Sequence, residues 1–232
     1  MKRLLASLLG GALTMLPTTA LAQGPSGFGT QGQFVLGVER LFGLNFYNGH
    51  YEPDNGGPDR NQSRTQFSLL WNNASVGGLP GLNPYAIPRV TFDYAVIDNL
   101  TIGGSIGYAS VSGEDDIDGP LDDDDYETAT LFAFSPRVGY ILRFNDIVGM
   151  WLRGGVTYYS IGQDDFGTAS GFGINLEPGF IFTVAPGFGI SATPSLDLPI
   201  AGSFNDDAGV DNADGDYRVR NFGANAGLFF YF

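Results

Sequence analysis

The last sixteen residues of the chain alternate between two kinds of side chain. From Phe222 onward the even-numbered positions are all apolar, whereas the odd-numbered positions from Asn221 to Gly227 are glycine or asparagine. Successive side chains of a β-strand point to opposite faces of the sheet, so this period of two predicts a strand with one apolar and one small or polar face. The apolar positions are Phe222, Ala224, Ala226, Leu228, Phe230 and Phe232.

The same alternation recurs upstream, and the sequence predicts eight strands in an all-β fold. Each block is as long as, or longer than, the roughly 9–11 residues that a tilted strand needs to cross a bilayer. Three connections are tight turns, at Asp98–Asn99, Asn145–Asp146 and Pro186–Gly187, and four are long loops. Short turns on one side and long loops on the other are typical of membrane barrels. The predicted strands are 33–42, 89–97, 100–111, 128–144, 147–161, 171–184, 188–200 and 217–232.

The long connection 43–88 contains one further apolar stretch, Thr65–Trp71. Counting it as a membrane strand would give nine strands and would break the alternation of short turns and long loops. We therefore expect it to belong to an extended hairpin that stands above the membrane or packs on the rim of the barrel.

The first 22 residues have the composition of a secretory signal peptide. Lys2 and Arg3 precede an apolar run from Leu4 to Leu16, and the small-x-small triplet Ala20-Leu21-Ala22 predicts cleavage before Gln23. The apolar run is too short for a comfortable membrane anchor. The remaining residues, 23–232, are expected to form one outer-membrane β-barrel domain.

Composition excludes several function classes. Removing Lys2 and Arg3 takes the formal net charge from −14 to −16, which argues against nucleic acid as a partner. The chain has no cysteine, so neither disulfides nor a thiol catalyst are available. His50, the single histidine, lies in a stretch rich in Gly, Asn and Pro, without the rigid frame that a catalytic base needs. We therefore expect no enzymatic activity.

Seven charged residues fall on the face opposite to the apolar one and are expected to point into the barrel. Eight strands enclose a space only wide enough for side chains, and the many glycines on this face leave room for large neighbours. Unpaired buried charges cost several kcal/mol each, and the planar guanidinium of Arg suits paired carboxylates. We predict an interior network that either fills the barrel and specifies the fold or re-pairs as a gate for a narrow ion path. The seven are Glu39, Arg89, Asp93, Arg137, Arg153, Glu177 and Asp197.

Two long loops are crowded with carboxylates. In the first, Glu114, Asp116, Asp118 and Asp125 loosely resemble a calcium-binding loop, although no flanking helices are expected. Two interpretations stay open: solvated loops whose charges repel, or a loosely bound divalent cation such as calcium that bridges to lipopolysaccharide phosphates. No other cofactor is expected.

The signal peptide, the eight alternating strands, the Glu-Arg-Leu-Phe-Gly segment 39–43 and the terminal phenylalanine together resemble small bacterial outer-membrane β-barrel proteins of the eight-stranded OmpA/OmpX-like group. That resemblance implies an eight-stranded antiparallel up-and-down transmembrane barrel in the outer membrane, inserted as a monomer by the barrel-assembly machinery among lipid and lipopolysaccharide. In such proteins the last strand carries the assembly signal, which the resemblance places on Phe232, Phe230 and Leu228.

Two functions stay open for such a barrel. One is a structural or surface-interaction role that presents the acidic loops, and the other is a narrow porin-like channel for small ions or solutes. A soluble barrel that carries a ligand inside would need its apolar face inward. Here the opposite face carries the charges, which favours lipid on the outside.

Overall fold

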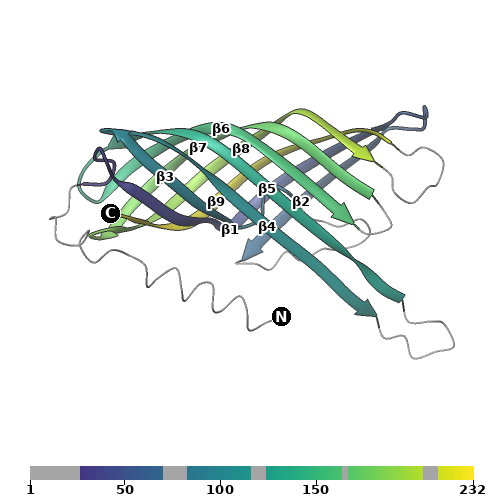
Figure 1. The fold of residues 1–232 in the computed structure, drawn as a ribbon, viewed down its shortest axis with the longest axis horizontal. Coiled ribbons are helices and arrows are strands. Elements are labelled where there is room, and N and C mark those ends of the chain that lie inside the picture. Colours follow the sequence, from purple (N-terminus) through teal and green to yellow (C-terminus); the bar gives the residue numbers. More distant parts are fainter. Residues whose placement is uncertain (1–26, 70–82, 116–123, 164–166, 206–213) are drawn as a thin grey trace.

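The computed structural model describes residues 27–69, 83–115, 124–163, 167–205 and 214–232, so the predicted signal peptide lies outside the described residues. The described chain forms one antiparallel sheet that closes into a barrel where β1 pairs with β9 (Figure 1). The described residues contain no helix that is long and apolar enough to cross a membrane. The strands are β1 (Phe34–Pro53), β2 (Arg60–Leu69), β3 (Arg89–Ile97), β4 (Leu100–Asp115), β5 (Asp124–Arg143), β6 (Val148–Gln163), β7 (Gly167–Ala185), β8 (Phe188–Asn205) and β9 (Gly215–Tyr231).

The sheet has nine strands but eight positions around the ring. One edge of β1 pairs with β9 from Val35 to Pro53. Along the other edge, the first part of β1 pairs with β3 and the second part pairs with β2. The strands β2 and β3 therefore follow one another in a single position of the wall. The predicted all-β barrel is confirmed, with the second position of its wall shared by β3 and the additional strand β2.

The tight turns gather at one end of the barrel, which we call the turn end, and the long connections lie at the opposite, loop end. The turn between β3 and β4 and the C-terminus both lie at the left of Figure 1. At two of these turns the backbone adopts positive φ, at Asn99 (68°) and Gly187 (78°), where asparagine and glycine are the residues best tolerated.

The expected position of Thr65–Trp71 was wrong in part. A hairpin does form, but Thr65–Leu69 belongs to β2 in the wall, where Phe67 pairs with Leu44 and both side chains point outward. Residues 70 and 71 lie outside the described residues. The strand was underestimated because its first half, from Arg60, is polar on both faces. The continuation of β1 to Pro53 is not predicted because its outward positions are polar from Asn48 onward, which interrupts the alternation.

At the loop end, two sheet edges have no partner among the described strands. Among the described strands, β2 pairs with β1 alone, and β4 pairs on its β3 side only up to Gly107. From Tyr108 onward, β4 keeps β5 as its single described neighbour. We call this break in pairing between β2 and β4 the seam; the β1–β2 and β4–β5 hairpins diverge on either side of it at the right of Figure 1.

Large apolar side chains point outward all around the barrel. Aromatic rings mark both limits of this band: Phe34 and Tyr94 lie 4.8 Å apart by ring centroids near the turn end, and Phe46 and Phe222 lie 6.3 Å apart toward the loop end. Aromatic girdles that flank an apolar band are typical of membrane barrels. The apolar face of the strands is therefore turned outward, opposite to the arrangement that a soluble ligand carrier requires.

Candidate functional site

The centre of the barrel is occupied by charged side chains, and Arg137 of β5 lies among most of them. Its guanidinium donates to Glu39 Oε2 at 2.7 Å and to Asp93 Oδ2 at 2.7 Å, and it lies 3.5 Å from Glu177 Oε2. Arg153 of β6 bridges two of the same partners, at 2.9 Å to Glu39 and 3.1 Å to Glu177. None of these side chains is more than 7% exposed, so the pairs lie out of water.

Arg40 also belongs to this network, although strict alternation along β1 points it toward lipid. Between Val38 and Phe42 the register of β1 against β9 shifts, so that a bulge forms, and Arg40 adopts a positive φ of 59°. The bulge turns the side chain inward, where it lies 2.6 Å from Glu177 Oε1 and 3.6 Å from Asp197 Oδ1.

A signal for this bulge is present in the sequence. Arg40 interrupts the apolar face between Val38 and Phe42, and an arginine on the lipid face near the bilayer midplane costs about 2–4 kcal/mol. A local shift of register that brings the guanidinium to carboxylates avoids that cost.

The predicted residues are brought together with one exception. Six of the seven join the network, with Asp197 paired to Arg40 and held by the amides of Asn175 (2.6 Å) and Asn221 (3.0 Å). Arg89 is buried but forms no ion pair with a described residue. It donates instead to Ser135 Oγ at 3.2 Å and to the carbonyl of Pro84 at 3.0 Å. Counting Arg40 and Arg89, four guanidinium groups face four carboxylates.

The segment 83–88 enters the barrel just before β3 begins. Asn83 donates to Asn221 Oδ1 at 2.9 Å and accepts from the backbone amide of Tyr85 at 3.0 Å. Two guanidinium groups hold its carbonyl oxygens, because Arg40 donates to Tyr85 and Arg89 donates to Pro84. The sequence predicts this segment only as the end of the long connection 43–88. The sequence feature that indicates an inward position is the run Tyr85-Ala86-Ile87, whose residues are fully buried.

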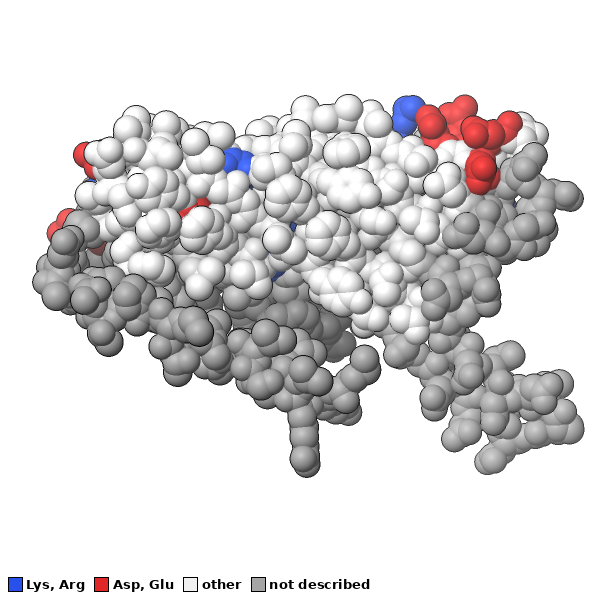
Figure 2. Space-filling view, in the orientation of Figure 1, with Lys and Arg blue, Asp and Glu red and all other residues white. Residues whose placement is uncertain are grey.

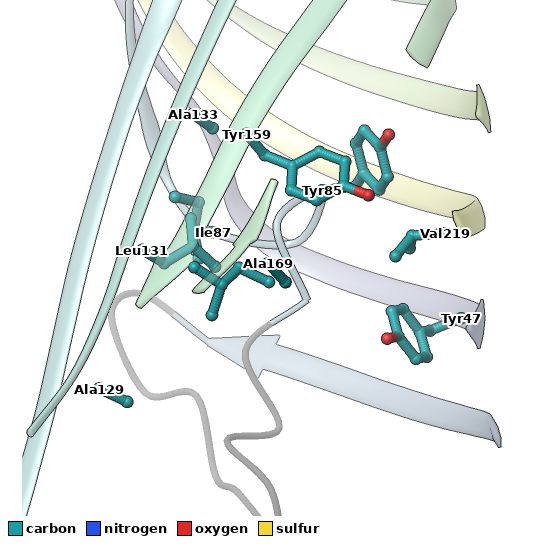
Figure 3. Close-up of a cluster of buried hydrophobic side chains, with 10 residues drawn as sticks. Tyr47, Tyr85, Ile87, Ala129, Leu131, Ala133, Tyr159, Ala169 and Val219 are labelled. Atoms are coloured by element: carbon teal, nitrogen blue, oxygen red, sulfur yellow. The ribbon is translucent and has the colours of Figure 1, made fainter. Parts of the chain in front are cut away.

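On the loop-end side of the network, the inserted segment helps to form an apolar layer, the upper layer (Figure 3). Tyr85 and Tyr159 meet edge to face at 5.6 Å, and their buried hydroxyls have no hydrogen-bond partner among the described residues. A side chain at Gly173 would place its Cβ 2.6 Å from the Tyr85 hydroxyl, so only glycine fits there. The upper layer comprises Tyr47, Tyr85, Ile87, Ala129, Leu131, Ala133, Tyr159, Ile161, Ala169 and Val219.

On the turn-end side, a second cluster, the lower layer, forms around Phe28. This residue precedes β1, and its ring packs against Trp151 (5.3 Å), Phe229 (4.9 Å) and Tyr231 (5.3 Å) by centroid distance. The guanidinium of Arg153 lies 4.7 Å from the centroid of the Trp151 ring, which connects the lower layer to the charged network. The lower layer comprises Phe28, Val35, Ile141, Trp151, Ile181, Phe229 and Tyr231.

The remaining predicted sites have different outcomes. Asp116 and Asp118 lie outside the described residues, and only the backbone of Glu114 and Asp125, which are paired across β4 and β5, is described. No cluster of three metal-binding side chains occurs among the described residues.

The proposed assembly-signal residues and His50 are described. Leu228 and Phe230 point outward from β9, and the carbonyl of Phe232 accepts from the amide of Phe34 at 2.9 Å. His50 lies on β1 rather than in a loop and contacts Asn61 Oδ1 at 2.8 Å.

Comparison with known proteins identifies the fold. No protein-family model and no curated protein matches the sequence. The outer membrane protein OprG from Pseudomonas aeruginosa is 12% identical, with 88% of this chain and 97% of that chain covered and a TM-score of 0.53. AlkL (13% identity, 90% and 94% covered) and Neisserial surface protein A (14%, 90% and 99%) match at TM-scores of 0.49 and 0.42. The OprG comparison shows the fold, that of a small outer-membrane β-barrel.

Proposed function

We propose that this outer-membrane-type barrel has an interior closed to flow along its axis and serves a structural or surface-interaction role. The supporting observation is that three buried layers follow one another inside the wall: the lower layer around Phe28, the charged network and the upper layer with the segment 83–88. Outer-membrane residence, contact with lipopolysaccharide, insertion by the assembly machinery, a monomeric state and the lack of catalysis all belong to this proposal.

The energetics of the network favour a fixed structure over a gate. Each of the four network carboxylates has at least one guanidinium within 4 Å, so re-pairing must first separate a buried ion pair. Breaking such a pair costs about 3–5 kcal/mol. At a factor of ten for each 1.4 kcal/mol, an opened network would be populated at roughly one part in 10² to 10⁴. The charges therefore serve to fill the barrel and to fix the register of its strands.

Single-channel recording tests this proposal. Purified barrel in a planar bilayer should give no resolvable conductance steps, because water meets three closed layers in series. The variant Phe28→Ala, which opens the lower layer alone, should also stay silent. Regular conductance steps from the wild-type protein would refute the closed interior, and steps from Phe28→Ala alone would show that one layer carries the whole barrier.

A second candidate function rests on a different observation. The seam adjoins the part of the barrel that the apolar upper layer fills, and this layer holds two buried hydroxyls without a described partner, those of Tyr85 and Tyr159. We infer that a small apolar molecule with one polar oxygen could enter the upper layer and leave sideways into the membrane. This route differs from the narrow porin-like channel for small ions or solutes that the sequence leaves open.

Equilibrium binding of 1-naphthol, which is fluorescent and carries one hydroxyl, tests this candidate. The wild-type barrel should bind it saturably, and Ala133→Phe, which fills the upper layer beside Tyr159, should weaken binding at least tenfold. The control Ala192→Phe places the same ring on the outward face and should leave affinity unchanged. Folding of both variants is checked by heat-modifiable gel mobility, since overpacking costs about 1–3 kcal/mol. Non-saturable partitioning into the wild type would rule the candidate out.

A further inference from the structure

The arginines of the barrel are divided sharply by position. Nine follow the predicted signal peptide, and the chain has no lysine after Lys2. Four are buried inside and Arg143 lies at the turn end. The other four are carried by β2 and β9, the two strands that flank β1 at the loop end: Arg60, Arg64, Arg218 and Arg220.

The pairing register arranges the outward side chains of these three strands in rows. The first row closes the apolar band with Phe46 and Phe222, and the next two rows carry guanidinium, amide, imidazole and hydroxyl groups. The row beyond them is acidic. In Figure 2, blue atoms border the white band toward the right-hand end and red atoms lie beyond them. From the band outward the rows are Thr65, Phe46 and Phe222; Ser63, Asn48 and Arg220; Asn61, His50 and Arg218; and Glu52 with Asp216.

The side chains of the middle rows are positioned by one another. Asn48 donates to Ser63 Oγ at 2.9 Å, and His50 contacts Asn61 at 2.8 Å. Arg218 pairs with Asp216 at 2.7 Å, but both side chains are about half exposed (51% and 52%), and a surface ion pair of this kind is weak because solvent screens it. Arg220 is exposed. Both guanidinium groups are therefore available to a stronger anionic partner.

We propose that this outward face of β1, β2 and β9, centred on Arg218 and Arg220, binds the phosphate groups of a phosphorylated glycolipid in the surrounding outer leaflet. The inference rests on the proposed membrane location. The two basic rows lie directly beyond the aromatic edge of the apolar band, at the level where lipid headgroups begin. Guanidinium groups pair with phosphate through two parallel hydrogen bonds, which makes arginine the residue suited to this ligand.

The charge of the whole chain favours a lipid over a soluble anion. With a formal charge of −16 after removal of the signal peptide, the protein repels dissolved phosphate. A lipid phosphate is instead held at the surface by its own acyl chains, which raises its effective concentration beside the basic rows. The acidic row with Glu52 and Asp216 then limits the headgroup to the space between itself and the apolar band.

Binding of lipid A to the purified barrel in detergent micelles tests the proposal. The diphosphorylated form should bind at least tenfold more tightly than the dephosphorylated form, and the double variant R218Q/R220Q should abolish this difference. The control R60Q/R64Q removes the same number of charges from β2 and should change affinity less than twofold. Inorganic phosphate at the same concentration should not compete.

Two results would overturn the inference. Equal binding of the two lipid forms by the wild type would show that phosphate is not recognised. Equal losses of affinity in R218Q/R220Q and R60Q/R64Q would show that only the net charge of the protein matters. The proposed function is tested by a separate measurement, the single-channel conductance. Conductance steps from a barrel that still distinguishes the two lipid forms would refute the closed interior but not the phosphate site.

Discussion

Replacing Arg137 with methionine is expected to lower the free energy of unfolding of the barrel by about 3–5 kcal/mol, the cost of removing one partner from a buried ion pair. Arg137 contacts three carboxylates, and Asp93 has no other ion-pair partner among the described residues. The variant would leave four buried carboxylates facing three guanidinium groups. Methionine keeps much of the side-chain volume, so the decrease in the free energy of unfolding comes from the missing charge rather than from a cavity.

Urea titration of the folded barrel in lipid vesicles measures this loss, with heat-modifiable gel mobility as the readout of the folded fraction. The matched control is Arg143→Met at the turn end, which removes an exposed guanidinium that donates to Asn99 Oδ1 at 3.0 Å. That control should stay within about 0.5 kcal/mol of the wild type. If Arg137→Met shifted the midpoint no further than Arg143→Met, the network would not be what stabilises the closed interior.

The parts of this fold that the sequence predicts are those set by contact with lipid. Within the apolar band, the outward side chains of a strand must be apolar, and the inward side chains must be small or paired with another polar group. The resulting alternation predicts strands such as 89–97, which the structure reproduces as β3. The same alternation assigns the inward face of Glu39, Asp93, Arg137, Arg153, Glu177 and Asp197, and the structure brings these residues into one network.

Beyond the apolar band the strands no longer contact lipid, so the sequence no longer needs to alternate between apolar and polar residues. The outward positions of β1 past Phe46 and of β2 before Phe67 carry polar side chains, so the alternation of apolar and polar residues no longer marks these parts of the strands. The segment 83–88 was hidden for a related reason. Its inward position is fixed by hydrogen bonds from Arg40 and Arg89 to its carbonyls, and no side-chain pattern records which carbonyl an arginine will reach.

The alternation also does not predict the inward position of Arg40, which depends on a bulge and on a hydrogen bond to a backbone carbonyl. A double-mutant cycle measures how much Arg40 stabilises the barrel. Arg40→Met should destabilise the barrel by about 3–5 kcal/mol, because it leaves Asp197 without its described ion-pair partner. Adding Asp197→Asn should then restore at least about 1 kcal/mol, since it neutralises the stranded carboxylate and close partners couple by about 0.5–3 kcal/mol. The amides of Asn175 and Asn221, which now donate to Asp197, can rotate to match the new amide.

The control for this cycle is Asp93→Asn in the Arg40→Met background, followed by the same urea titration. Asp93 pairs with Arg137 and not with Arg40, so its neutralisation should give no recovery and should add a loss of its own. Equal recovery from both asparagine variants would mean that only the total charge of the interior matters. Recovery from Asp197→Asn alone would show that, of the two carboxylates that Arg40 meets, Asp197 is the one that depends on its guanidinium, and that a single shift of register in β1 completes the charge balance of the barrel.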